Sequence, residues 1–433
     1  MRSATEYDIP ALADFYDNIF REEHDPPAGF RTWIVDLTSG QHPVCRVDNF
    51  VVVEDQRRDG RIVSSGVLLP QRCMFAGVAV TAGQPELIAT DPDYRHRGLV
   101  REVIEGLHGI SQRLDHLFQF IGGIPWFYRQ FGYEYAVAMN MTRTLSATDM
   151  PRLPAGQTEP FSIRLAEAGD LSDLQRLHRQ ASQRWLLSTV CDEARWRYEL
   201  LERSRASLET FNIWTLVRGD ERTGKVVGYG LAKSRLRGSK LGIWELVADE
   251  DISWHSLLPS VLRGFQCEGQ TLAAATEGAT FDRLEISLDG DHPAWEFLQP
   301  LLSPRRPPYA WYVRVADLPR LVRQIAPALE KRLARSPMAG YSGSLEISFF
   351  REAVCMAWQD GKLEQFESLP MEALEGHRPA AMFPPLVFLQ LLFGARTLDQ
   401  LQESFADCRA TNEARLLLTH LFPPQPSSIR PLV

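Results

Sequence analysis

The feature that most constrains this chain is the run Arg95-His96-Arg97-Gly98-Leu99-Val100. It follows residues 86–89, an apolar stretch typical of a strand, and it precedes apolar residues at the spacing of one helix face (99, 103, 107, 110 and 114). The run is therefore a turn from a strand into a helix. The first backbone N–H groups of a helix lack partners and carry partial positive charge, and a glycine lets a phosphate approach them closely. The sequence predicts a pyrophosphate-binding turn.

This turn resembles the acetyl-CoA loop of the GNAT acetyltransferases, where Arg-x-x-Gly-x-(Gly/Ala) follows a strand and opens a helix. Arg95 and Gly98 match the pattern, whereas Val100 departs from the usual small residue. Downstream, residues 127–134 (Phe-Tyr-Arg-Gln-Phe-Gly-Tyr-Glu) resemble a second signature of the family, a short helix whose tyrosine lies near the thioester. Two motifs in this order would rarely coincide by chance. The alternative is an ordinary turn with solvated arginines and an aromatic core helix.

The resemblance implies a fold, a cosubstrate and a set of binding residues. The expected fold class is α/β (α+β), with two GNAT acyl-CoA N-acyltransferase-like domains in tandem and a sterol-carrier-protein-like domain after them. The expected cosubstrate is acetyl-CoA. The residues expected to bind it are Ile88, Ala89, Thr90, Arg95, His96, Arg97, Gly98, Leu99 and Val100.

Tyr128 is the candidate catalytic residue for protonating the departing thiolate. A phenol has a pKa of about 10, so it stays protonated at neutral pH and can supply that proton. Tyr133 is the competitor, and it is expected in the core of the following strand. The alternative for Tyr128 is a buried ring whose hydroxyl bonds a backbone carbonyl.

Asp25, Trp33 and Glu86 are candidates for an acceptor pocket, because the family places acidic and aromatic groups in comparable segments. An acidic pocket would favour a cationic amine. The alternatives are a solvated carboxylate, a core tryptophan and a glutamate at a strand edge.

His108 and His116 have no evident carboxylate partner and are interpreted as ordinary polar surface. His96 could contact phosphate or simply be exposed.

A chain of 433 residues fits two to three domains. The first, residues 1–150, is expected to contain the catalytic GNAT fold. A linker with three prolines follows at 146–160. The elements expected in the first domain are a helix at about 8–21, strands at 46–54, 61–69 and 72–80, a strand ending at Thr90, a strand at 117–121, and strands within 133–145.

Residues 160–315 look like a degenerate copy of the first domain. Glu245-Leu246-Val247-Ala248 mirrors Glu86-Leu87-Ile88-Ala89, but Trp254-His255-Ser256-Leu257 stands where the arginines and the glycine would be. A repeat of about 160 residues indicates duplication, because the repeats of a solenoid span about 20–50 residues. This copy is expected to bind no CoA.

Residues 316–433 are expected to form a basic helix at 317–335, three strands and three helices. Two GNAT-like units followed by such a domain resemble the enhanced intracellular survival (Eis) family, whose third domain is similar to sterol carrier proteins. In that family the C-terminal tail returns to the acetyltransferase pocket, and its terminal carboxylate assists deprotonation of the amine. Carried over, this catalytic carboxylate belongs to Val433. The alternative is a tail that packs on the third domain or is disordered.

Composition narrows the class of protein. Hydrophobic residues make up 44% and the net charge is −8, which argues for a globular chain and against general binding to nucleic acid or membranes. Six scattered cysteines and no apolar leader indicate reduced thiols in a cytoplasmic protein with no metal site.

The predicted function is an acetyl-CoA-dependent N-acetyltransferase acting on a primary amine of a small molecule or peptide, in a possible homo-oligomer. A non-catalytic interaction protein and a lipid carrier are the alternatives.

Overall fold

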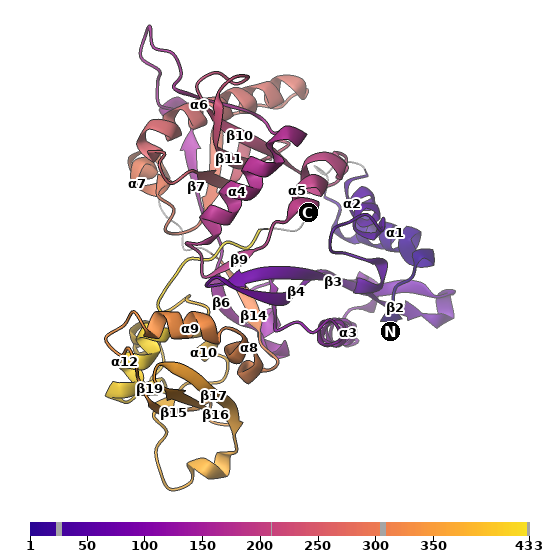
Figure 1. Cartoon of the computed structure of the whole chain (residues 1–433). Helices are drawn as coiled ribbons and strands as arrows, with labels where there is room; N and C mark the ends of the chain where they lie inside the picture. The colour runs from indigo at the N-terminus through magenta and orange to yellow at the C-terminus, as the bar shows by residue number, and fades with distance from the viewer. Residues whose placement is uncertain (23–27, 209, 304–308, 431–433) are drawn as a thin grey trace.

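The computed structural model describes residues 1–22, 28–208, 210–303 and 309–430, which form three sheets with helices packed on them (Figure 1). The first unit is built on the sheet β1-β2-β3-β4-β5-β14-β6, with β9 added beside β3. Its strands are β1 (Arg2–Ser3), β2 (Phe50–Asp55), β3 (Arg61–Phe75), β4 (Val78–Thr90), β5 (Phe118–Ile121), β6 (Glu134–Ala138), β9 (Leu187–Thr189) and β14 (Ala310–Arg314). Its helices are α1 (Ile9–Phe20), α2 (Gly29–Thr38) and α3 (Leu99–Arg113), and a short 3-10 helix, η5, spans Phe127–Phe131.

The strands expected at 61–69 and 72–80 are not two separate strands. β3 is continuous to Phe75 and turns into β4 through Ala76 and Gly77, both at positive φ. Pro70 cannot donate to a ladder, yet it is accommodated opposite Gly83 in the β3–β4 pair. The helix α2 was not predicted, while α1 confirms the helix expected at 8–21.

The second unit is built on the sheet β7-β13-β12-β11-β10-β8. Its strands are β7 (Met141–Ser146), β8 (Phe161–Leu165), β10 (Phe211–Arg218), β11 (Lys225–Lys233), β12 (Lys240–Ala248) and β13 (Arg283–Leu288). Its helices are α4 (Leu171–Ser182), α5 (Glu193–Arg197), α6 (Trp254–Ala275) and α7 (Ala294–Leu298).

The two sheets exchange strands across the boundaries expected at 150 and 315. β7 precedes residue 150 but pairs with β13 in the second sheet. β14 precedes residue 315 but inserts between β5 and β6 of the first sheet. β9, between α4 and α5 of the second unit, likewise pairs with β3 of the first sheet, so the backbone passes between the two units several times.

Two features recur at equivalent places in the first and second units. Arg2 pairs with Asp8 at the start of the first unit, and Arg164 pairs with Asp170 at the start of the second, each at 2.7 Å. In the sheets, Glu86 of β4 stands opposite Val67, and Glu245 of β12 stands opposite Leu231 in the same way.

The third unit is built on the sheet β17-β16-β15-β18-β19. Its strands are β15 (Gly343–Ser348), β16 (Ala353–Gln359), β17 (Lys362–Leu369), β18 (Ala381–Met382) and β19 (Arg409–Ala410). Its helices are α8 (Leu318–Gln324), α9 (Ala326–Leu333), α10 (Phe388–Leu392), α11 (Leu398–Ser404) and α12 (Asn412–Leu421).

The basic helix expected at 317–335 is therefore two helices, broken at Ile325, because Pro327 lies in the first turn of α9. The third unit also shares a core with the first. The ring of Phe393, after α10, packs edge-on against Phe75 and Phe118 of the first sheet. None of the helices in the described ranges is long and apolar enough to span a membrane.

The C-terminal tail leaves the third unit and runs along β9, between the first and second units (Figure 1, yellow trace). Leu186 donates to the carbonyl of Pro426 at 2.7 Å, and Ser428 donates to the carbonyl of Leu187 at 2.8 Å. The described part of the tail thus extends the first sheet as a short parallel segment.

Candidate active site

The predicted phosphate turn lies between β4 and α3. Gly98 is the N-cap residue of α3 and has φ = 81°, a conformation that glycine adopts at little cost. No heavy atom lies within 4 Å of the place where a Cβ would stand, so the space next to the turn is open. The unpaired N–H groups at the start of α3 border this open space, as an anion site requires.

The three basic residues of the turn differ in how they are held. Arg97 lies 4.7 Å from the centre of the Tyr94 ring and donates to the Asp93 carbonyl at 3.0 Å. The exposed side chain of Arg95 makes no hydrogen bond or ion pair within the described residues. His96 is exposed and has φ = 63°. Arg95 is thus the arginine whose charge is available to a ligand.

β4 and β5 form an opening beside this turn. They pair in parallel only at Ala82–Phe118 and Gly83–Gln119. Beyond Gly83, β4 carries a bulge at Leu87 (φ = 53°) and continues to Thr90 without β5 as a partner. A backbone edge without a partner can pair with an extended ligand.

The other predicted cosubstrate residues line or support this opening. Ile88 and Val100 are half-buried and pack on the apolar cluster that contains Tyr128. Val100 therefore has a packing role that the usual small residue could not fill. Ala89 and Thr90 are held from the other side, where the Ser64 hydroxyl contacts the Ala89 carbonyl at 2.9 Å and the Thr90 hydroxyl at 2.8 Å.

Tyr128 lies in η5 and is 7% exposed. Its ring packs edge-on against Phe127, Tyr133 and Tyr312. A Cβ on Gly123 would come within 2.6 Å of this ring, so only glycine fits there. The hydroxyl has no hydrogen-bond partner among the described residues, unlike the alternative in which it bonds a carbonyl.

Burial, reinforced by the nearby Glu86 carboxylate, raises the pKa of Tyr128 above its usual value. The phenol therefore keeps its proton throughout the neutral range. The charge of Glu86 thus acts on Tyr128, so two of the predicted site residues are coupled electrostatically.

Tyr133 is a core residue, as expected, at 1% exposed. Its hydroxyl contacts His108 at 3.0 Å and also donates to Gln119. The interpretation of His108 as ordinary polar surface is wrong, because burial and the charge of Arg314 lower its pKa to about 4. It is also wrong for His116, which contacts Ser111 at 3.2 Å and whose pKa burial lowers to about 4.

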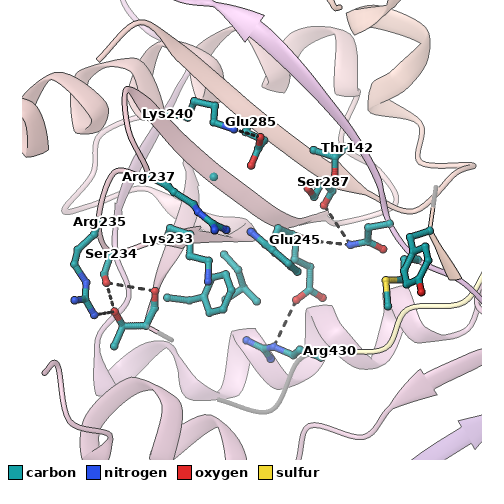
Figure 2. A pocket seen from close by; sticks show the side chains of 18 of the residues that line it. Thr142, Lys233, Ser234, Arg235, Arg237, Lys240, Glu245, Glu285, Ser287 and Arg430 are labelled. Carbon is teal, nitrogen blue, oxygen red and sulfur yellow. Dashed lines mark hydrogen bonds and ion pairs between the residues drawn. The ribbon is translucent and has the colours of Figure 1, made fainter. Parts of the chain in front are cut away.

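A cavity of about 1580 Å³ lies between the first unit, the second unit and the tail (Figure 2). Trp33 and Glu86 line it from the first unit, together with Phe20 and Phe30. Asp25, the third predicted acceptor residue, lies outside the described residues. Val433 also lies outside them, three residues after Arg430, the last described residue.

The sequence analysis missed several residues of this site. Tyr309 and Trp311, next to or within β14, line the cavity, and Tyr309 donates to the carbonyl of Gly123. Glu245 and Arg430 line it as well (Figure 2). Tyr309, Trp311 and Arg430 reach the cavity through the strand exchange or the returning tail, which no local signal marks, whereas Glu245 stands out in the sequence as the counterpart of Glu86.

In the second unit the equivalent turn is closed. His292 contacts the Leu246 carbonyl at 2.9 Å, on the strand that corresponds to β4. The ring of Trp254, the first residue of α6, lies 4.8 Å from the His292 ring. His292 and Trp254 thus cover the end of β12 where α6 begins. Within the described ranges, no group of three His, Cys, Asp or Glu residues could hold a metal ion.

Comparison with known proteins identifies the first unit. Residues 1–136 match the family model described as an acetyltransferase (GNAT) domain. Residues 1–136 are a GNAT acetyltransferase domain. The protein is therefore an acyltransferase enzyme, and domains of this kind use an acyl-CoA as cosubstrate.

Solved structures resemble the whole chain. A GCN5-related N-acetyltransferase from Anabaena variabilis has a TM-score of 0.67 at 16% identity, over 99% of this chain and 98% of its own. A probable N-acyltransferase from Enterococcus faecalis has a TM-score of 0.65 at 14% identity, over 99% of this chain and 96% of its own. Eis1 from Mycobacterium abscessus has a TM-score of 0.56 at 14% identity, over 94% of this chain and 97% of its own. At these identities the likeness concerns the fold, and curated sequences give no match.

Gly98→Glu should weaken CoA binding by about tenfold or more, because the side chain strains a positive φ and adds negative charge at the anion site. Titration calorimetry with CoA measures this. Gly109→Glu is the matched control, since Gly109 lies on the same helix with open space around it and no positive φ. Equal affinities for the two variants would contradict the assignment of the turn.

Proposed function

We propose that the protein transfers the acetyl group of acetyl-CoA directly to a primary amine of a small molecule or peptide. The observation that carries the proposal is the position of Tyr128. It packs on the same cluster as Ile88 and Val100, which border the opening of β4 and the phosphate turn. Pyrophosphate at Gly98 and pantetheine along β4 would bring the thioester toward this tyrosine.

The reaction needs an amine that attacks the thioester carbonyl and a thiolate that leaves. The Tyr128 phenol supplies the proton that converts the leaving thiolate into a thiol. Its raised pKa, caused first by burial, keeps the phenol protonated at neutral pH, so it is present as a hydrogen-bond and proton donor when the thiolate forms. Trp33 and Glu86 in the cavity supply an aromatic face and a negative charge for a cationic amine.

The terminal carboxylate of Val433 is proposed to accept the proton of the attacking amine. Two observations support it: the resemblance to the Eis family, and the path of the described tail, whose residues 427–430 line the same cavity as Glu86.

The third unit is proposed to be sterol-carrier-like, on the resemblance in domain order, without a part in the reaction. The apolar helix that suggested lipid transport is a core element. Phe388, in α10, is 2% exposed and packs against Phe349, Phe383 and Phe422. The structure therefore provides no observation that favours a lipid carrier.

The function is tested with a panel of primary amines, by following free thiol released from acetyl-CoA and the acetylated amine by mass spectrometry. The panel includes alkylamines, polyamines, amino sugars and peptides with free N-termini. At least one amine should release thiol in proportion to its acetylation. Tight CoA binding without transfer to any amine would favour a non-catalytic interaction protein.

Tyr128→Phe should lower kcat by about 10²–10⁴-fold while CoA affinity stays within twofold, because the ring is kept and only the proton donor is lost. Steady-state kinetics with an accepted amine and calorimetry with CoA measure the two quantities. Tyr135→Phe, which removes a hydroxyl bonded to Tyr309, is the control. A fall in kcat of less than threefold in Tyr128→Phe would show that Tyr128 has a packing role only.

Deleting Leu432 and Val433 moves the terminal carboxylate back by two residues. We expect turnover to fall well beyond any change in CoA affinity, and the loss to shrink at high pH, where the amine is already deprotonated. Extending the chain by two alanines after Val433 displaces the carboxylate and keeps both side chains, so it should have the same effect. Wild-type turnover in both variants would exclude the carboxylate from the reaction.

A further inference from the structure

The last described residue of the tail, Arg430, is buried in the second unit. It is 4% exposed, and its guanidinium lies 4.0 Å from the centre of the Trp196 ring. One guanidinium nitrogen lies 2.9 Å from a carboxylate oxygen of Glu199, and another lies 3.6 Å from Glu245 (Figure 2 shows the latter pair). A buried guanidinium stacked on an indole between two carboxylates is held by both ion pairing and a cation–π contact.

The carboxylates of this site are charged at neutral pH. Burial alone would raise the pKa of Glu245, but the Arg430 and His178 charges outweigh it and lower the pKa to about 2. The pKa of Glu199 is also lowered, by Arg430 and Arg195 acting against burial.

The place of this site in the second unit corresponds to the acceptor pocket of the first. Glu245 occupies the register position of Glu86. It pairs with Leu231, two residues after Tyr229 on β11, just as Glu86 pairs with Val67, two residues after Ser65 on β3. The second helix of each unit contributes a tryptophan, Trp33 in α2 and Trp196 in α5.

The geometry points to Arg430 as a positioning residue. The second unit lacks the cosubstrate turn but has a cation-binding site where the acceptor pocket would be. The guanidinium of Arg430, from the tail of the same chain, fills this site. The bound guanidinium holds residues 427–430 in place as one wall of the cavity that accepts the amine. This inference rests on the proposed function for its effect on catalysis, but the binding of Arg430 can be tested separately.

The backbone around Arg430 shows why the guanidinium would control the tail. Its N–H donates to the Thr189 hydroxyl at 3.1 Å, and its carbonyl accepts from Arg195 at 3.4 Å. Beyond these bonds, β9 and the tail share a short parallel pairing at Ser188 and Ser428. A single short ladder is weak alone, and removing one partner of a buried ion pair is strongly destabilising, so loss of the guanidinium should loosen the segment.

The experiment compares full-length Arg430→Gln and Arg430→Lys with wild type by hydrogen exchange of the amides of Leu187, Thr189 and Ser428. Arg430→Gln should speed exchange at these amides by at least about tenfold. Arg430→Lys keeps the charge but not the planar guanidinium, so its amide exchange rates should lie between those of wild type and Arg430→Gln. Glu199 and Glu245 keep Arg195 and Tyr229 as partners in both variants, at 2.9 and 2.7 Å, which favours a folded protein.

Arg263→Gln is the matched control. Arg263 forms an ion pair with Glu159 at 2.5 Å in the second unit and does not line the cavity, so tail exchange should not change. With an accepted amine, Arg430→Gln should raise KM for the amine by about tenfold or more while CoA affinity stays as in wild type.

Tail exchange in Arg430→Gln equal to that in the Arg263→Gln control would overturn the inference. Faster exchange with an unchanged KM for the amine would overturn the positioning role. If wild type acetylates no amine, the proposed function fails, and the exchange comparison still decides whether Arg430 holds the tail.

Discussion

The separation of β4 from β5 is the constraint on which the rest of this molecule depends. Two residue pairs join these strands, and β4 continues past them to Thr90 without β5 as a partner. A sheet that opens in this way leaves backbone groups without partners, and an extended ligand can satisfy them. β4 ends at Thr90, shortly before the turn at Gly98 that begins α3, so the opening and the anion site adjoin.

The opening also explains why the neighbouring units contribute to the site. β14 inserts beside β5 and supplies Tyr312, whose ring packs against Tyr128. The second unit closes one side of the cavity, and the tail passes between them. In the second unit, His292 bonds the carbonyl of Leu246 on β12 and its ring packs against Trp254, so side chains lie at the end of this strand.

Sequence patterns predicted the parts of the site that depend on local structure. The glycine before α3 and the helix that follows it are marked by composition and spacing, and Tyr128 lies in a short motif. Glu245 and Arg430 are nearly two hundred residues apart in sequence and meet only because the tail returns, so no local pattern could show their contact. The place of β14 was missed for the same reason, since a short apolar strand does not specify which sheet it joins.

We propose that acyl-CoA binds along β4 and at the turn of the first unit, once per chain. Hydrogen exchange with and without saturating CoA, together with the binding stoichiometry from calorimetry, measures this binding. We expect one CoA per chain and slower exchange in residues 87–90 and 98–102, with no change in residues 246–248 and 254–258. Two molecules per chain, or protection confined to the second unit, would contradict it.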